Sequence, residues 1–421
     1  MPSPDSARRR LLQALSASLL PAAKPLWAAR AEQRLEFWTM QLSPHLDAYV
    51  NELIAGFQAR HPGVTVKWVD LPWAETERKL LSAIAAGGSP DVVNLNPQFS
   101  AKLAEFGALA DPEQYLGADE RADYLPAAWN ANRLDGRCFA LPWYLSTNLT
   151  LVNQRLLGGA DIPASHQQLL AAAPVIKRGS GAFAYFPALD GSSPLETLVA
   201  MGAELLSPGG CGAGFINVEG QRVFDFYRRL YAEGLTPRNV VSEGHRKAVE
   251  MFLSGQVAVV SSGMQFLSYI RNANRDVYRE IEAAPQLHAP GRKPGIAAMN
   301  LVVPEASPNK ELAFRFARFV TAPLQQLEFA RRVPILPSTR ASYADPLFAA
   351  PDSSDLLGRA RALSARHVLD GEVQVPPLRN YNKLRSNYAR NLQAVMLGRR
   401  PRDEALADIG RQWGQLLGCK R

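Results

Sequence analysis

The stretch GRCFALPWYLSTNLTLVNQRLL, residues 136–157, holds two apolar runs that are separated by a short polar joint, Ser146-Thr147-Asn148. Pro142 stands near the end of the first run, removes one backbone donor and keeps the chain before it extended. The aromatic pair Trp143-Tyr144 follows directly. A strand that presents aromatics, breaks at small polar residues and then resumes is expected where a chain crosses between two lobes beside a ligand-binding cleft.

Strands and helices alternate before this stretch. Strands are predicted at 34–40, 64–71 and 91–95, and helices at 46–60 and from about residue 74 onward. Apolar residues recur at helical spacing within 46–60, and Pro62-Gly63 stop that helix. This alternation indicates an α/β lobe with a largely parallel sheet.

The same alternation returns after the stretch. Helices are predicted at 165–173, 194–206, 219–233, 382–395 and 402–417, with strands near residue 182 and within 251–263. A chain of 421 residues is long enough for two domains. No long polar linker separates the two halves, so short crossings are expected to join the lobes.

The first 31 residues have the pattern of a cleavable signal peptide. Arg8-Arg9-Arg10 precede an apolar run from Leu11 to Ala23, and Ala29-Arg30-Ala31 forms an A-x-A cleavage site. The mature chain is expected to start at Glu32 and to be a soluble protein of the periplasm. The adjacent arginines also resemble a twin-arginine signal, and the sequence does not separate that route from general secretion.

The net charge of the chain argues against nucleic acid as a partner, and its cysteines leave the disulfide pairing open. The net charge of +8 becomes smaller without the leader, which holds five basic residues and a single acidic one, so nucleic acid is not an expected partner. Cys138, Cys211 and Cys419 lie far apart without the spacing of a metal site. They are compatible with one disulfide of unknown pairing or with simple packing.

The sequence contains no recognisable catalytic motif and only an incomplete candidate for a metal site. The chain has no Gly-x-Ser-x-Gly elbow, no phosphate-cradling loop and no His-Glu-x-x-His motif. His45 and Asp47 follow the first predicted strand and could supply two metal ligands, although a four-coordinate site needs more. An acidic residue at the start of a helix is the more ordinary explanation of Asp47. We therefore expect no catalytic residues and no cofactor.

Several stretches, in this order along the chain, resemble the extracytoplasmic solute-binding proteins of ABC importers, of the maltose-binding, sugar-binding type. These are HPGVTVKWV from His61, AIAAGGSPDVVNL from Ala83, the 136–157 stretch, NLVVPEASPNKELAFRFARFVTAP from Asn300 and VPPLRNYNKLRSNYARNLQAVMLGRRPRDEAL from Val375. Together they span the mature chain from end to end.

The resemblance implies an α/β, two-lobe periplasmic-binding-protein fold with a ligand cleft at the hinge between the lobes. The N-terminal lobe would comprise residues 32–144 plus 301–340, and the C-terminal lobe residues 145–300 plus 341–421. Hinge closure would capture a carbohydrate or sugar derivative. We expect a monomer that delivers this ligand to an ABC transporter permease in the inner membrane.

Candidate ligand-binding residues follow from the resemblance and from the rule that ligands meet the carboxyl ends of strands. They are Gln41, Ser43, Asn96, Gln98, Trp143, Tyr144, Gly263, Met264, Gln265, Asn300, Arg379, Tyr381, Asn382 and Arg385. Trp143 and Tyr144 are the first choice, because sugar rings stack on aromatic faces. The alternative that both are core aromatics under the hinge stays open.

Departures from the maltose-type pattern affect the expected ligand. Gln265 stands where that pattern has a stacking tryptophan, and arginines 379 and 385 surround the aromatic position of the tail. Guanidinium groups bind phosphate bidentately, so an anionic sugar, such as a phosphorylated one, is a candidate ligand. The alternatives are a binder of another small solute or of a metal ion, and a secreted two-lobed enzyme.

Overall fold

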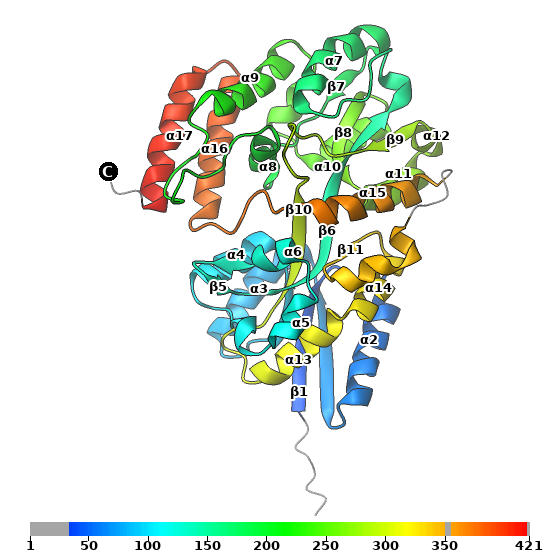
Figure 1. Ribbon diagram of the computed structural model, residues 1–421, viewed down its shortest axis with the longest axis vertical. Helices are drawn as coiled ribbons and strands as arrows, with labels where there is room; N and C mark the ends of the chain where they lie inside the picture. The colour runs from blue at the N-terminus through cyan, green and yellow to red at the C-terminus, as the bar shows by residue number, and fades with distance from the viewer. Residues whose placement is uncertain (1–32, 350–354, 419–421) are drawn as a thin grey trace, which may run out of the picture.

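The computed structural model describes residues 33–349 and 355–418 of the chain. The predicted signal peptide, the start of the mature chain at Glu32 and Cys419 lie outside the described residues. Figure 1 shows two lobes that follow one another along the longest axis, with strands β6 and β10 running from one to the other. Among the described residues, no helix combines the length and the apolar character that a membrane span requires.

The N-terminal lobe is the lower one in Figure 1. Its main elements are β1 (Gln33–Met40), α2 (Asp47–Arg60), β2 (Val64–Leu71), α3 (Trp73–Ala85), β3 (Val92–Leu95), α4 (Pro97–Glu105), α5 (Ala118–Ala122), α6 (Pro126–Asn130), β4 (Arg133–Leu134) and β5 (Arg137–Cys138). Later in the chain, this region gains β10 (Ile296–Val302), α13 (Lys310–Val320), α14 (Pro323–Arg332) and β11 (Leu336–Pro337).

The C-terminal lobe begins within the long strand β6 (Leu141–Asn153). It contains α7 (His166–Ser180), β7 (Phe183–Tyr185), α8 (Ser193–Ala200), α9 (Val218–Ala232), α10 (His245–Leu253), β8 (Val257–Gly263), α11 (Gln265–Ala273), α12 (Arg275–Arg279), β9 (Ile281–Ala284), α15 (Leu356–Asp370), α16 (Tyr381–Met396) and α17 (Arg402–Leu417). Short 3-10 turns lie at 112–114, 154–156, 238–241, 340–344 and 346–348.

One sheet continues through both lobes, in the strand order β2-β1-β3-β10-β6-β8-β7, with β9 and β11 also paired to β6. Strands β1, β2 and β3 are parallel, as the alternation of strands and helices predicts. Strand β10 is antiparallel to both β3 and β6, so the sheet is mixed. Strand β10, which makes the sheet mixed, is also the second strand that crosses between the lobes.

The polar joint of the opening stretch is the place where β6 changes partners. Up to Thr147, β6 pairs with β10 and β11. From Asn148 onward it pairs with β8 and β9. The pairing of β6 with β10 ends and its pairing with β8 begins within a single residue step, whereas pairing with β11 ends at Leu145 and pairing with β9 begins at Thr150.

The hydrophobic cores lie on either side of this joint. Two clusters fill the N-terminal lobe, one around Phe37, Phe57 and Phe316 and the other around Leu80 and Val93. A larger cluster fills the C-terminal lobe. Burial of this apolar surface is the main stabilising contribution to each lobe. The lobe boundaries given above stay a prediction.

Most of the predicted elements occur close to their expected bounds, but the helix expected at 165–173 continues to Ser180 and another is shorter. The helix expected at 194–206 ends at Ala200 in the structure. Gly202 has a φ of 104°, a conformation that L residues with a side chain rarely adopt, and the chain turns there. Cys138 is buried and Cys211 half-buried, and both are free thiols.

Candidate functional site

A cavity lies between the lobes at the joint of β6. It occupies about 860 Å³ of space outside the protein atoms, part of it open solvent. The N-terminal lobe contributes the start of α4 and the end of α6, and the C-terminal lobe contributes α8. The segment 371–380 between α15 and α16 also lines this cavity, and its Glu372 bridges to Gly295 just before β10.

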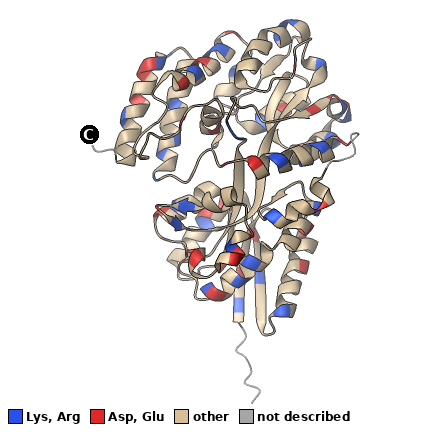
Figure 2. Ribbon diagram, viewed as in Figure 1, with Lys and Arg blue, Asp and Glu red and all other residues tan. Residues whose placement is uncertain are grey.

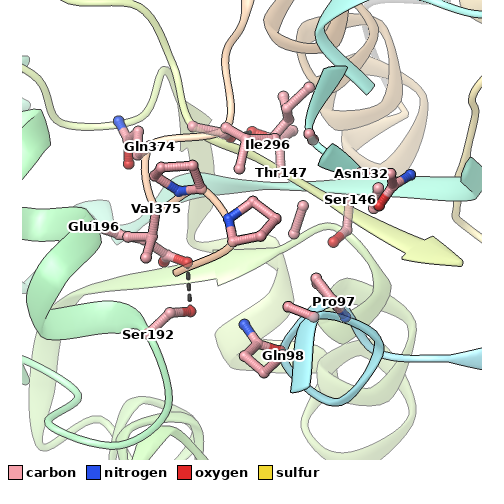
Figure 3. Close-up of a pocket in the computed structure, with 18 of the residues that line it drawn as sticks. Pro97, Gln98, Asn132, Ser146, Thr147, Ser192, Glu196, Ile296, Gln374 and Val375 are labelled. Carbon is pink, nitrogen blue, oxygen red and sulfur yellow. Dashed lines mark hydrogen bonds between the residues drawn. The ribbon is translucent and has the colours of Figure 1, made fainter. Parts of the chain in front are cut away.

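The lining is rich in uncharged polar groups that come from both lobes. Figure 3 shows Pro97 and Gln98 on one side, across the cavity from Ser192 and Glu196. The amides and hydroxyls around the cavity belong to Gln98, Asn132, Ser146, Thr147, Asn148, Ser192, Gln286, Gln374 and Tyr381. Such groups are suited to bonding a ligand that carries many hydroxyls.

Two further pockets continue the cavity. A second pocket in the C-terminal lobe shares Asn148, Glu196 and Gln286 with it. A third pocket at the mouth shares Gln98 and Tyr381. Because neighbouring pockets share residues, the three form one groove, which we call the interlobe cleft.

The backbone of Gly295 is hydrogen-bonded to two side chains that line the first pocket. Its backbone N–H donates to Gln286 Oε1 at 2.6 Å, and its carbonyl accepts from Thr147 Oγ1 at 2.7 Å. A Cβ at this position would lie 2.5 Å from Gln374 Oε1, so a larger residue there would displace the end of that side chain. The floor is thus positioned by hydrogen bonds between β6, β10 and the loop after β9.

Some buried polar atoms of the cleft have no hydrogen-bond partner among the described residues, and two of them lie on side chains that are themselves buried. They are Gln374 Oε1 and His166 Nδ1, on side chains with 6% exposure each. A buried polar atom without a partner costs free energy, so each calls for a ligand or an ordered water. Both atoms lie on residues that line the cleft.

The second pocket contains two histidines and the Glu196 carboxyl. Burial, together with the nearby His288, lowers the pKa of His166 to about 4. Burial also lowers the pKa of His245, whose Nε2 lies 3.2 Å from Ser262 Oγ. The Glu196 carboxylate accepts a hydrogen bond from Ser192 Oγ at 2.5 Å, while burial raises its pKa.

Several residues predicted from the sequence line the cleft. Gln98 and Tyr381 lie where two of its pockets meet. The other predicted residues in its lining are Asn96, Gly263, Gln265, Asn382 and Arg385. Asn96 also caps α4, accepting from the Phe99 N–H at 2.8 Å. The structure therefore brings these residues together, and their contact with a ligand stays a prediction.

The first-choice aromatics lie elsewhere. Trp143 is 0% exposed, stacks on Phe329 and packs in the core of the N-terminal lobe, so its expected place at the cleft floor is wrong. Tyr144 faces the same phenylalanine edge-on and is not in the cleft lining. Both residues are therefore core aromatics under the hinge, which is the alternative that the sequence left open.

Other predicted residues also lie outside the cleft lining. Met264 and Asn300 are buried beneath it, with exposures of 3% and 0%. Gln41 and Ser43 are exposed in the turn after β1, where the Ser43 N–H donates to Asp70 Oδ2 at 3.1 Å. The end of β1 was expected to reach the cleft, but this turn is held against β2 instead.

Arg379 does not line the cleft but joins the two lobes. Its Nε donates to Asp135 Oδ2 at 2.9 Å, and Asp135 lies in the turn between β4 and β5. Next to it, the Asn380 N–H lies 3.4 Å from the carboxylate of Glu105 at the end of α4. The guanidinium expected to bind an anionic ligand is thus paired with an aspartate of the other lobe.

Arg379→Ala is expected to weaken this interlobe contact modestly. More than half of each side chain is exposed, and exposed ion pairs contribute about 0–1 kcal/mol. A double-mutant cycle with Asp135→Ala, read by urea unfolding in low and high salt, should give a coupling within that range that shrinks as salt rises. A coupling above 2 kcal/mol would contradict the assignment. Arg315→Ala on α13 is the control.

Sequence reasoning missed much of the C-terminal side of the cleft. Glu196 lies on the short helix α8 and Ser192 is its N-cap, several residues beyond the end of β7, and Gln374 lies in the segment 371–380. The polar joint Ser146-Thr147-Asn148 was noticed as a bend and not as lining. Its position between two apolar runs was the available signal.

No metal cluster accompanies these residues. Within the described parts of the chain, no three His, Cys, Asp or Glu side chains are grouped so that they could hold a metal ion. His45 is exposed, and Asp47 is the acidic residue of the first turn of α2. The helix dipole explains the latter position.

Known proteins share this architecture and part of the sequence. Residues 43–327 match the family of bacterial extracellular solute-binding proteins. A candidate oligosaccharide periplasmic-binding protein of Synechococcus sp. MITs9220, solved in complex with zinc, is 35% identical, with a TM-score of 0.84 and coverage of 91% of this chain and 99% of that one.

Two more relatives are sugar-related by name. The sugar-binding protein MalE of Xanthomonas citri has the same fold, with 22% identity, a TM-score of 0.76 and coverage of 92% and 98% of the two chains. The mannitol-binding protein of Pseudomonas aeruginosa is 24% identical over 380 residues, which are 83% of this chain and 86% of that protein.

Proposed function

Because the chain belongs to the family of bacterial extracellular solute-binding proteins, we propose that it captures a carbohydrate in the interlobe cleft and delivers it to the permease of an ABC importer. It is a substrate-binding protein and not an enzyme. Export to the periplasm by the predicted signal peptide and action as a monomer belong to the same proposal.

One observation carries the carbohydrate assignment: side-chain amides and hydroxyls from both lobes converge on one cavity. Amides both donate to and accept from sugar hydroxyls. Tyr381 in the first pocket and Phe266 in the second offer aromatic faces for the apolar side of a sugar ring. The oligosaccharide-binding and mannitol-binding designations of the relatives agree with this chemistry.

The lining argues against a phosphorylated sugar. In the described lining of the first two pockets, Glu196 is the sole Asp, Glu, Lys or Arg. The cations Lys102 and Arg385 lie at the third pocket, where Lys102 pairs with Glu77 at 2.5 Å. A phosphate inside the first two pockets would meet a carboxylate and no Lys or Arg in their described lining.

The two lobes supply a mechanism for capture. Gln98 and Asn132 belong to the N-terminal lobe, whereas Ser192 and Glu196 belong to the C-terminal lobe. A ligand that bonds both sets favours the closed arrangement over the open one by its differential affinity. Strands β6 and β10 link the lobes near Thr147, and in Figure 2 neither crossing strand carries a charged residue.

A thermal-shift screen of the mature protein tests this function. The panel contains neutral mono-, di- and trisaccharides, sugar phosphates, polyols and divalent metals including zinc. A sugar at a hundred times its Kd should stabilise the protein by about 2.7 kcal/mol. Stabilisation by metals alone, with no response to any sugar, would overturn the proposal.

Gln98→Ala tests the cleft itself. Gln98 is exposed at the start of α4 and reaches two of the pockets. Losing its hydrogen bonds to a sugar should weaken binding about 3- to 10-fold, measured by calorimetry, without changing the stability of the free protein. Gln167→Ala, on the exposed surface of α7, is the matched control. Equal affinities for both variants would contradict the assigned place of the ligand.

A further inference from the structure

Glu196 is a lone charge at the centre of the cleft. It lines both the first and the second pocket, and its neighbours in these linings are amides, hydroxyls, histidines and apolar groups. Its single side-chain hydrogen bond comes from Ser192 Oγ, and no Lys or Arg of the described residues pairs with it. Figure 3 shows both side chains on the same wall of the cavity, facing Gln98.

A carboxylate in this position is incompletely compensated. An ionised carboxylate has room for about four hydrogen bonds on its two oxygens, and Ser192 supplies one. Removing water when the lobes close makes an unpaired charge more costly. Burial already disfavours the charged form in the free protein, since it raises the pKa of Glu196. The hydroxyls of a neutral sugar could donate to the free acceptor sites of this carboxylate but would leave its negative charge uncompensated, whereas a cationic ligand would also offset the charge.

We propose that the carbohydrate bound in the cleft carries an amino group, and that its ammonium pairs with the Glu196 carboxylate. This inference rests on the proposed function and specifies the class of sugar. The rest of the cleft fits such a ligand. Its amides bond hydroxyls, and the first two pockets lack a Lys or Arg that would repel the ammonium. Tyr381 lines the same pocket, and its ring face attracts a cation.

A purely structural role for Glu196 is the alternative. It lies in the first turn of α8, where the helix dipole favours an acidic residue, and its bond from Ser192 closes that turn. Such a role would stabilise α8 without any effect on ligand choice. The ligand preference of a Glu196 variant therefore separates the two roles.

The test is calorimetric titration of the wild-type protein with matched sugars at pH 7.5 and low salt. Glucosamine, glucose and N-acetylglucosamine form one set, and the corresponding β-1,4 and α-1,4 disaccharides form two more. In at least one set the amine is expected to bind about tenfold or more tightly than its hydroxyl and acetamido counterparts. Glu196→Gln should reduce this preference, measured as the ratio of the amine affinity to the affinities of its neutral counterparts, to about twofold or less.

Glu243→Gln is the matched control, because Glu243 is exposed in the same lobe and does not line the cleft. This control should keep the full preference for the amine. Glu196→Gln removes a buried charge, so it should melt no lower than wild type at pH 8, which excludes misfolding as the cause of a lost preference.

Three outcomes would overturn the inference. The neutral sugars bind as tightly as the amines in every set, or Glu196→Gln leaves the amine preference unchanged, or both Gln variants lose it equally. If no sugar of any kind binds, the proposed function fails as well, so the two failures are distinguishable.

Discussion

Trp143→Ala is expected to lower the free energy of unfolding by about 3–5 kcal/mol, the range for truncating a large aromatic in a packed core. The Trp143 ring is 0% exposed. It stacks on Phe329 at 5.3 Å between centroids and meets Phe37 edge-on at 6.2 Å. Removing the ring leaves a cavity beneath the crossing strand that these neighbours cannot fill. Urea unfolding at pH 7.5 measures the loss.

Trp143→Phe separates packing from ligand contact. It keeps much of the apolar volume, and it removes Nε1, a buried donor without a hydrogen-bond partner among the described residues. We expect a smaller loss of stability and unchanged sugar affinity. Trp73→Ala is the control, since Trp73 is 45% exposed and its truncation should change stability by about 0.5 kcal/mol or less. If the Trp143→Phe protein is stable but binds sugar poorly, the prediction is wrong and Trp143 contributes to sugar binding.

Lowering the pH from 7 to 4 is expected to destabilise the protein through His166 and His367. Burial is the main cause that lowers the pKa of each to about 4 from the ordinary 6.5. The unfolded chain therefore binds more protons than the folded chain between these values, and stability falls as the pH falls through this window. A shift of this size corresponds to about 3 kcal/mol for each histidine.

His166→Gln should flatten this pH dependence. Urea unfolding at pH 4, 5, 6 and 7 gives the slope, and the variant is expected to lose about half of the acid destabilisation that the two buried histidines cause. Glu196 acts in the opposite direction, because burial raises the pKa of its carboxyl, so the difference in slope between variant and wild type is the quantity to compare. His45→Gln, at an exposed position, is the control for the substitution itself. Equal slopes for all three proteins would contradict the prediction.

The regular elements of the N-terminal lobe were predictable because their patterns are local. Helix α2 buries Val50, Leu53 and Phe57 at helical spacing, and β1 to β3 are short apolar runs bounded by turn residues. The family was also predictable, because its stretches occur in order along the whole mature chain. The end of α8 at Ala200 was missed, since apolar residues continue beyond it and Gly202 alone marks the turn.

The candidate site was predictable only in part. Residues directly after a strand or at a helix start, such as Asn96, Gln98 and Gln265, line the cleft. Ser43 and Asn300 were predicted by the same rule but do not line the cleft. The turn that holds Ser43 is hydrogen-bonded to β2, and Asn300 is fully buried. A strand's neighbouring side chains face opposite sides of the sheet, and the sequence of β6 does not say which side meets the cleft.

The sequence by itself indicated α/β lobes and a crossing at residues 136–157, because hydrophobic periodicity and turn residues act over a few positions, and its resemblance to a known family indicated the kind of protein. Only the tertiary structure decided what the crossing carries. It buried Trp143 in the N-terminal core, paired Arg379 with Asp135 and left Glu196 as the sole Asp, Glu, Lys or Arg in the described lining of the first two pockets. These outcomes depend on contacts between residues far apart in the chain, and the packing of the two lobes around β6 sets those contacts.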